Sequence, residues 1–377
     1  MIDDSSYART RRTVFSSARL LSVLNLDGPL LLGLGALAIY GLIILYSASG
    51  QSVDTIVRTV MRLALGTAAM LALTHASPNV LRRLAPWLYL IGVLLLLVVA
   101  VSGVIGKGAQ RWLNLGLFKF QPSEIMKLAV PMLAAWYLHD RPLPPTWSSL
   151  LMLGLIIFLP TALVAVEPDL GTAALIAASG ALLVLMAGLS MRIIVMVLLG
   201  TVAAALLGWS SLHEYQRTRV LTFLNPQTDP LGAGYHIIQS QIALGSGGLF
   251  GKGWMNGSQA QLEFLPERST DFIFAVVGEE FGLIGLIVLL ALYLFIVARS
   301  VWLAMQTNDT FSRLLALSLG LTFFVYVFIN AGMVSGLVPV VGVPLPLVSY
   351  GGTSVVTLLA GFGILMGLYS HRKLIGS

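Results

Sequence analysis

The sequence predicts an all-α, polytopic transmembrane helix bundle of about ten spans with both termini in the cytoplasm. Hydrophobic residues make up 57% of the 377 residues and charged residues only 10%, whereas soluble globular chains carry about 25% charged residues. Uncharged apolar runs of about 20 residues recur, and each is long enough to cross a bilayer as a helix. The alternation of apolar and polar residues that strands of a transmembrane barrel require does not appear in the sequence.

The apolar runs place spans near residues 30–48, 55–74, 84–103, 122–139, 149–166, 170–188, 192–210, 271–297, 311–335 and 352–370. We expect one membrane domain over residues 1–377, with a basic cytoplasmic arm at 1–28 and an uncleaved first span. The loops that this orientation puts in the cytoplasm carry Arg82, Arg83, Arg141, Arg192, Arg299, Arg313, Arg372 and Lys373. The net charge of +6 is therefore explained by membrane orientation rather than by binding to nucleic acid.

One long loop, at residues 211–270, joins the seventh and eighth spans on the outer side. Glycine, proline and polar residues mark its turns, for example in Gly245-Ser246-Gly247-Gly248. Apolar residues such as Tyr235, Trp254 and Phe264 are too frequent for a disordered segment. We expect the loop to pack against the membrane domain without disulfides, because the chain contains no cysteine.

Asp271 stands where the long loop enters the eighth span. A carboxylate at this boundary has water on one side and apolar surroundings on the other, which suits it to take a proton from a substrate. An acidic residue in the first turn of a helix is also favoured by the helix dipole. Position alone leaves both interpretations open.

Glu124 and Lys127 lie three residues apart at the start of the fourth span, so they share a helix face. Pro122 and Glu124 also form an ordinary helix start, but an ammonium group one turn deeper needs a partner or a polar cavity. Asp169 lies in the very short connection between the fifth and sixth spans, where it either caps the sixth helix or faces a site.

Two further features concern the last three spans. Glu279 and Glu280 lie about two turns into the eighth span, where carboxylates must face the bundle interior. We favour a structural role for both, with Asn330 as a possible hydrogen-bond partner. The prolines at 339, 344 and 346 and the glycines at 351 and 352 predict an irregular segment before the last span, covered by protein or water.

Three basic residues contradict the expected orientation, because Lys107, Arg111 and Lys119 fall on the outer side, between the third and fourth spans. A basic outer loop would suit an anionic ligand. Exceptions in short loops are the plainer explanation, and the charges alone do not decide between the two.

Several ordered motifs resemble the SEDS family of shape, elongation, division and sporulation proteins, especially its rod-shape branch, and they cover nearly the whole chain. They are Lys107-Gly108-Ala109-Gln110-Arg111-Trp112, Phe120-Gln121-Pro122-Ser123-Glu124, Pro168-Asp169-Leu170-Gly171-Thr172, Asp229-Pro230-Leu231-Gly232-Ala233-Gly234-Tyr235, and Glu263-Phe264-Leu265-Pro266-Glu267 with Thr270-Asp271-Phe272. The stretch from Asn330 through Pro339 and Gly342 to Gly351-Gly352 also matches.

The resemblance implies a peptidoglycan glycosyltransferase that polymerises lipid II at the outer face of the cytoplasmic (inner) membrane during rod elongation and releases undecaprenyl pyrophosphate. It implies that Asp271 is the catalytic base and that Glu124, Lys127 and Asp169 belong to the site. Arg111, Lys119 and Gln121 are further candidates for substrate binding. The resemblance also suggests a divalent cation, magnesium or manganese, but the sequence defines no metal ligands.

The partners that the resemblance implies are lipid II, a class B penicillin-binding protein that crosslinks the strands, and an elongation machinery with an MreB-type cytoskeleton. Two other functions stay open. A lipid II flippase would also need intramembrane charges and broken helices, although its polar residues should line a path through the midplane. A scaffold for the transpeptidase would need no reactive carboxylate.

Overall fold

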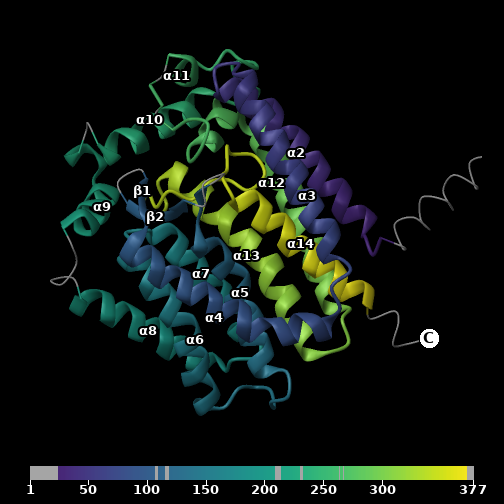
Figure 1. Cartoon of the computed structure of the whole chain (residues 1–377). Helices are drawn as coiled ribbons and strands as arrows, with labels where there is room; N and C mark the ends of the chain where they lie inside the picture. The colour runs from purple at the N-terminus through teal and green to yellow at the C-terminus, as the bar shows by residue number, and fades with distance from the viewer. Residues whose placement is uncertain are drawn as a thin grey trace, which may run out of the picture.

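The structure, a computed structural model, describes residues 24–106, 109–114, 119–208, 214–229, 232–262, 264–265 and 267–371. Each of the ten predicted spans corresponds to a helix, and Figure 1 shows most of these helices packed side by side, with α8 at the edge. They are α2 (Gly28–Ala48), α3 (Val53–Leu73), α4 (Pro78–Ser102), α5 (Pro122–Leu138), α6 (Trp147–Val166), α7 (Leu170–Met186), α8 (Met191–Gly208), α12 (Ile273–Met305), α13 (Thr310–Ser335) and α14 (Ser354–His371). The predicted all-α class is confirmed.

Within the described residues, seven helices are long and apolar enough to cross a membrane: α2, α3, α4, α6, α12, α13 and α14. Helix α7 and the first part of α8 are shorter apolar helices, and α5 contains Glu124 and Lys127. The chain is therefore a multi-pass membrane protein. The total of ten spans and the side of the membrane on which each end lies stay predictions.

Two ion pairs hold one end of the bundle together, which we call the arginine end. Arg82 lies 2.7 Å from Asp309, and Arg299 lies 2.7 Å from Asp27. Asp27 and Asp309 also accept a backbone N–H in the first turns of α2 and α13, so each carboxylate caps its own helix while it binds a second one. The opposite end, the loop end, contains residues 103–121, 167–169, 214–272 and 336–353 of the described chain.

A small antiparallel sheet at the loop end was not predicted. Strands β1 (Val104–Gly106), β2 (Ala109–Asn114) and β3 (Lys119–Phe120) lie in that order between α4 and α5. Strands β1 and β3, with three and two residues, are too short for an alternating pattern to be recognised, and the six residues of β2, AQRWLN, do not alternate strictly. The sheet places β2 beside the start of α5.

The irregular segment predicted before the last span is confirmed at residues 336–353, which contain no helix or strand. It begins where Gly336 ends α13 with a left-handed φ of 77°. Val343, Leu345 and Val348 in this segment are each 1% exposed. These parts of the segment are therefore covered by protein, as a non-helical backbone inside a membrane bundle must be, whereas Leu337 at its start is 72% exposed.

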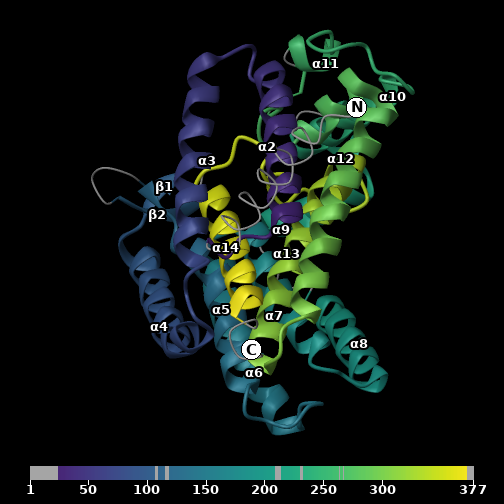
Figure 2. The same ribbon diagram turned by 90° about the vertical axis from the view of Figure 1, so that its right-hand side faces the viewer.

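Figure 2 shows the yellow 336–353 segment running among the helices before α14, and it comes close to two of them at glycines. A Cβ atom on Gly41 of α2 would lie 2.4 Å from the carbonyl oxygen of Leu347, and one on Gly171 of α7 would lie 2.4 Å from that of Val341. Either contact would force the backbones apart. These glycines thus allow the segment to cross the loop end of the bundle from α7 to α2.

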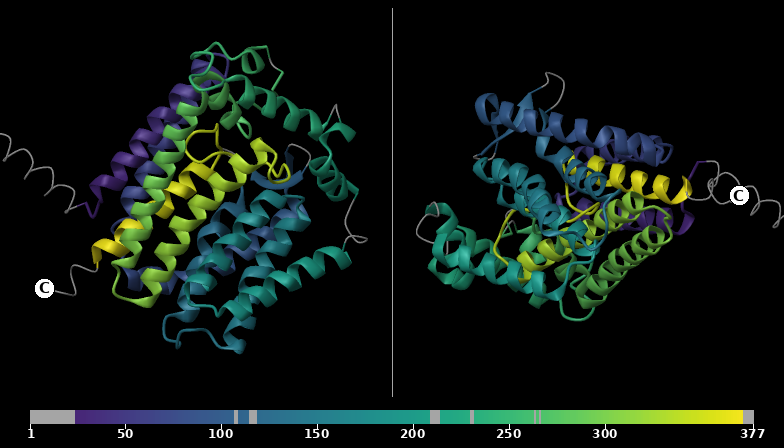
Figure 3. Two further views of the ribbon diagram at one scale, coloured as in Figure 1. Left: turned by 180° about the vertical axis from the view of Figure 1, so that it is seen from behind. Right: turned by 90° about the horizontal axis from the view of Figure 1, so that it is seen from below.

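The long loop folds into α9 (Glu214–Leu224), a short 3-10 helix η2 (Pro226–Thr228), α10 (Ala233–Ser246) and α11 (Ser258–Gln261). Helix α10 contacts α12 and α13, and Figure 3 shows these loop helices gathered at one end of the bundle. Ser240 donates to the carbonyl oxygen of Val334 at 2.9 Å, and the indole of Trp254 donates to that of Ile43 at 3.2 Å. The predicted packing of the loop against the membrane domain is confirmed.

Helix α12 is interrupted at Gly282, whose φ of 64° and ψ of −161° are readily adopted by glycine alone. The glycine-rich turn after α10 lies beside this break. The backbone N–H of Lys252 donates to Glu279 at 2.9 Å, and that of Leu283 donates to Gly248 at 2.9 Å. The turn therefore supplies hydrogen bonds that the interrupted helix cannot make within itself.

Glu279 and Glu280 are 0% and 1% exposed and bind the long loop and α2. Glu279 accepts from the ammonium of Lys252 at 2.7 Å, and Glu280 accepts from the hydroxyl of Ser47. These contacts agree with the structural role that we favoured. The suggested partner was wrong, because the amide of Asn330 donates to backbone oxygens elsewhere.

Candidate active site

A polar cavity opens at the loop end, and its space, including the part open to solvent, is about 630 Å³. Its walls come from β2, the starts of α5, α7 and α14, one residue of α13 and the 336–353 segment. The polar residues that line it are Arg111, Gln121, Glu124, Lys127, Asp169, Thr172, Tyr326, Thr353 and Ser354. Five of the predicted site residues, which are up to 58 positions apart in the sequence (111 to 169), therefore meet at one place.

Asp169 caps α7 and also lines the cavity. One of its oxygens accepts from the backbone N–H of Thr172 at 3.2 Å. The other accepts from the side-chain amide of Gln121 at 3.0 Å and lies 3.4 Å from the guanidinium of Arg111. Asp169 can therefore be both a helix cap and a site residue, because the cap uses one carboxylate oxygen and leaves the other in the cavity wall.

Glu124 and Lys127 form a buried ion pair on the first turns of α5. The ammonium of Lys127 lies 2.7 Å from Oε1 of Glu124, and the two side chains are 6% (Lys127) and 7% (Glu124) exposed. Lys127 Nζ also lies 5.2 Å from the centre of the Tyr326 ring. Oε2 of Glu124 is buried and has no hydrogen-bond partner among the described residues. A donor from a ligand would satisfy it.

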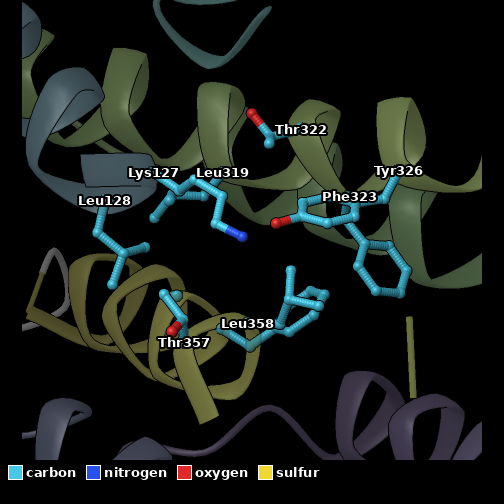
Figure 4. Close-up of a pocket in the computed structure, with 10 residues that line it drawn as sticks. Lys127, Leu128, Leu319, Thr322, Phe323, Tyr326, Thr357 and Leu358 are labelled. Carbon is cyan, nitrogen blue, oxygen red and sulfur yellow. The ribbon is translucent and has the colours of Figure 1, made fainter. Parts of the chain in front are cut away.

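A second, apolar cavity lies deeper in the bundle and shares Lys127 and Tyr326 with the polar cavity; its space, including the part open to solvent, is about 400 Å³. Figure 4 shows the Lys127 side chain extending from α5 into this space between α13 and α14. The rest of the wall is mainly apolar, with Leu128, Leu319, Phe323, Leu358 and Phe362. A charged group therefore marks the boundary between a polar chamber and an apolar one.

Asp271, the predicted base, lies two residues before α12 begins at Ile273, and the polar cavity is lined by residues near it rather than by Asp271 itself. Its carbonyl oxygen accepts from the Asn330 amide at 2.8 Å, and the same amide donates to Val343 at 2.7 Å. Oδ2 of Asp271 lies 3.4 Å from where a Cβ atom of Gly342 would be, and Gly342 lines the cavity. Asp271 is partly exposed and lies beside the cavity wall at Gly342 rather than in it.

Two predicted basic residues cannot be placed in the site. The backbone of Lys119 pairs with Asn114 in the sheet, but its side chain lies outside what the structure describes, and Lys107 lies outside the described residues altogether. Tyr326, which also lines the cavity, was not predicted from the sequence. A single tyrosine in an apolar span carries no signal that would have identified it.

Glu167 is a second carboxyl group beside Asp169 that the sequence did not single out. It is 5% exposed, and its Oε1 has no hydrogen-bond partner within the described chain. Burial and, to a smaller extent, the negative charge of Asp169 raise the pKa of Glu167 from its ordinary 4.5 to about 7, against the opposing effect of Arg111. Glu167 therefore carries a proton over much of the acidic range.

The pKa of Glu167 predicts a pH-dependent stability. The folded state holds this proton to a higher pH than the unfolded chain does. The contribution of Glu167 to the free energy of unfolding therefore falls as the pH rises from 4.5 to about 7. The Tm of Glu167→Gln, which cannot ionise, should exceed that of the wild type by a margin that widens over this window and is constant above it. Thermal unfolding in detergent at a series of pH values measures the margin, and a margin independent of pH would contradict the raised pKa.

The described residues contain no group of three or more histidine, aspartate or glutamate side chains that could hold a metal ion. The cavity carboxylates of Glu124 and Asp169 instead contact Lys127, Gln121 and Arg111. The oxygen ligands among the described residues do not form a complete protein site for magnesium or manganese. The divalent cation stays a prediction.

The sequence model of the FtsW/RodA/SpoVE family, described as cell cycle proteins, matches residues 29–374. The chain belongs to the FtsW/RodA/SpoVE family. The resemblance predicted from the motifs is thereby confirmed. Peptidoglycan glycosyltransferase MrdB of Escherichia coli K12 is 51% identical over 352 residues, which are 93% of this chain and 95% of that protein.

Solved structures of the FtsW/RodA/SpoVE family have the same fold. The crystal structure of the rod shape determining protein RodA from Thermus thermophilus is 31% identical, with a TM-score of 0.70, and the match covers 92% of this chain and 97% of that one. A chain from a peptidoglycan synthase complex that coordinates polymerization and crosslinking is also 31% identical, with a TM-score of 0.81 and coverage of 92% and 98%. Both cavities lie within the matched residues of the family.

Proposed function

We propose that this protein is a peptidoglycan glycosyltransferase that polymerises lipid II during rod-type elongation of the cell wall. The observation that carries the proposal is the polar cavity, which has cationic side chains in its walls and the Asp271 carboxylate beside Gly342 of its wall, in a chain 51% identical to a peptidoglycan glycosyltransferase. Lipid II has an anionic pyrophosphate between its sugars and its polyprenyl chain. A polar chamber beside an apolar one suits such a substrate.

In the proposed reaction, the sugar 4-hydroxyl of the acceptor attacks the anomeric carbon of the donor. A bond forms between this oxygen and the anomeric carbon, and the bond from that carbon to the pyrophosphate oxygen breaks. The hydroxyl proton passes to Asp271, and undecaprenyl pyrophosphate leaves with its electron pair. The α-linked donor thus gives a β linkage by inversion.

The basic side chains of the cavity act on the leaving group in this proposal. Lys127 and Arg111, together with Lys119 if its side chain reaches the cavity, stabilise the negative charge that develops on the departing pyrophosphate. Glu124 orients Lys127, and Asp169 and Gln121 orient Arg111 and the substrate. A divalent cation brought by the pyrophosphate would add positive charge at the same place. The apolar cavity below Lys127 would hold the first part of the polyprenyl chain.

We further propose that the arginine end faces the cytoplasm and that the polar cavity opens on the outer side of the inner membrane. The basic residues of the arginine end, including Arg82 and Arg299, support this orientation. A class B penicillin-binding protein is the proposed partner for crosslinking, because the similar chain of known structure comes from a peptidoglycan synthase complex. Attachment to an MreB-type elongation machinery is part of the same proposal.

A reconstitution experiment tests the proposed reaction against the flippase and scaffold alternatives. The purified protein and a class B penicillin-binding protein are placed in vesicles with fluorescent lipid II, and glycan formation and lipid translocation are both measured. We expect glycan strands and release of undecaprenyl pyrophosphate. Translocation without glycan would favour the flippase, and neither activity in a stable complex with the partner would favour the scaffold.

A further inference from the structure

Arg62 is a charged residue in the middle of α3, nine positions after the helix begins at Val53 and eleven before it ends at Leu73. A guanidinium at this depth is costly unless it binds a partner. Helix α3 lies at the periphery of the chain, where it buries Thr59, Gly66 and Met70. A charge at this depth therefore needs its own explanation.

The guanidinium of Arg62 contacts two consecutive residues of the 336–353 segment. Its Nη1 donates to the carbonyl oxygen of Gly351 at 2.8 Å, and its central carbon lies 4.5 Å from the centre of the Tyr350 ring. A planar guanidinium can stack on a ring and donate at its edge at the same time, which an ammonium cannot do. Arg62 thus fixes the Tyr350–Gly351 turn in two directions.

This turn is connected to Asp271 on one side and to the polar cavity on the other. The backbone N–H of Tyr350 donates to Ser269 at 2.8 Å, and the hydroxyl of Ser349 donates to Thr270. Ser269 and Thr270 directly precede Asp271. The residues that follow the turn, from Gly352 to Ser354, line the cavity. The turn therefore couples the backbone before Asp271 to the cavity wall.

We propose that Arg62 is a positioning residue, which holds the Tyr350–Gly351 turn and thereby sets where Asp271 stands relative to the polar cavity. The inference rests on the proposed function, because it gives Asp271 the role of base. A displacement of about 1 Å between a base and the group it deprotonates is enough to slow a reaction by about 10²-fold. Arg62 touches neither the substrate nor Asp271 in this proposal.

Steady-state kinetics with lipid II provide the first test. Arg62→Ala should lower kcat by roughly 10- to 100-fold and leave KM unchanged. Arg62→Gln keeps a hydrogen-bond donor and should recover part of kcat. Arg62→Lys should not restore the wild-type kcat, even though it keeps the positive charge. Arg58→Ala is the matched control, because Arg58 lies one turn away on the same helix, pairs with Asp54 and is 56% exposed. It should behave as the wild type.

A raised KM with an unchanged kcat in Arg62→Ala would overturn the proposal and assign Arg62 to substrate binding. An unchanged kcat and KM would overturn it as well. Thermal unfolding of each variant in detergent identifies any general loss of folding. Because Arg62→Gln retains a donor for Gly351, its kinetics test the proposal even if Arg62→Ala does not fold.

A second test does not depend on activity. The chain has no cysteine, so Thr353→Cys introduces the sole thiol, placed in the cavity wall just after the turn. Its rate of labelling by a maleimide should rise several-fold when Arg62→Ala is added and stay the same when Arg58→Ala is added. Equal rates in all three proteins would overturn the proposal. If the wild type makes no glycan, the proposed function fails, while the labelling experiment still decides whether Arg62 holds the turn.

Discussion

Asp271→Ala is expected to lower the rate of lipid II polymerisation by roughly 10²- to 10⁴-fold, the usual loss when a general base is removed. The variant should still fold, because Asn330 and the 336–353 segment bind the backbone around Asp271. It should also still bind lipid II, since the cations assigned to the pyrophosphate are unchanged. Glycan formation, lipid II binding and Tm, measured on the same preparation, check the three parts of this result.

Two further substitutions sharpen the test of Asp271. Asp271→Asn keeps the size of the side chain and removes the base, so it should be as inactive as Asp271→Ala. Asp140→Ala is the matched control, because Asp140 lies at the arginine end, contacts His139 and has an 84% exposed side chain. It should be fully active. Near-normal glycan formation by Asp271→Asn would remove Asp271 from the reaction as its base.

Lys127→Met is expected to lower both stability and polymerisation. Removal of the ammonium leaves Glu124 as a buried charge without its partner, and breaking a buried ion pair in this way typically costs about 3–5 kcal/mol. Loss of a charged donor to the pyrophosphate should in addition raise KM for lipid II by roughly 10-fold or more. Tm and the kinetic constants of the purified variant measure the two effects.

The double variant Glu124→Gln with Lys127→Met separates these effects, because it removes both buried charges. Its Tm should return toward that of the wild type, while KM stays high. A double variant with normal stability and normal polymerisation would show that the pair is structural. Arg299→Met is the matched control for stability, since Arg299 forms an ion pair with Asp27 far from the cavity, at the arginine end. Its KM should not change.

The helices could be predicted from the sequence because lipid requires long apolar segments with internal hydrogen bonds. The largest differences are at helix ends. Helix α4 begins at Pro78, six residues before the predicted 84, because its first turns contain the polar residues Arg82 and Arg83. Helix α12 ends at Met305, eight residues after the predicted 297, because it continues past Arg299. Hydropathy does not detect a helix that extends beyond the apolar layer.

The site was predictable where local spacing carries the information. Three positions along a helix place Glu124 and Lys127 on one face, and a cap position places Asp169 at the start of α7. The contacts of Arg62 and Tyr326 depend on how distant helices pack, and no local pattern encodes them. A mid-span arginine is nevertheless a signal in itself, so Arg62 could have been singled out from the sequence, although its partners could not.

The interruption of α12 at Gly282 has a consequence for how the protein is assembled during synthesis. The 33 residues of α12 contain a stretch long and apolar enough to cross a membrane, yet at Gly282 the helix needs hydrogen bonds from the turn after α10, which is made earlier in the chain. The shape of this helix is thus completed by a preceding segment of the long loop. A Cβ atom on Gly251 would lie 2.2 Å from the carbonyl oxygen of Glu280, so even a single methyl group in that turn would displace the backbone of α12.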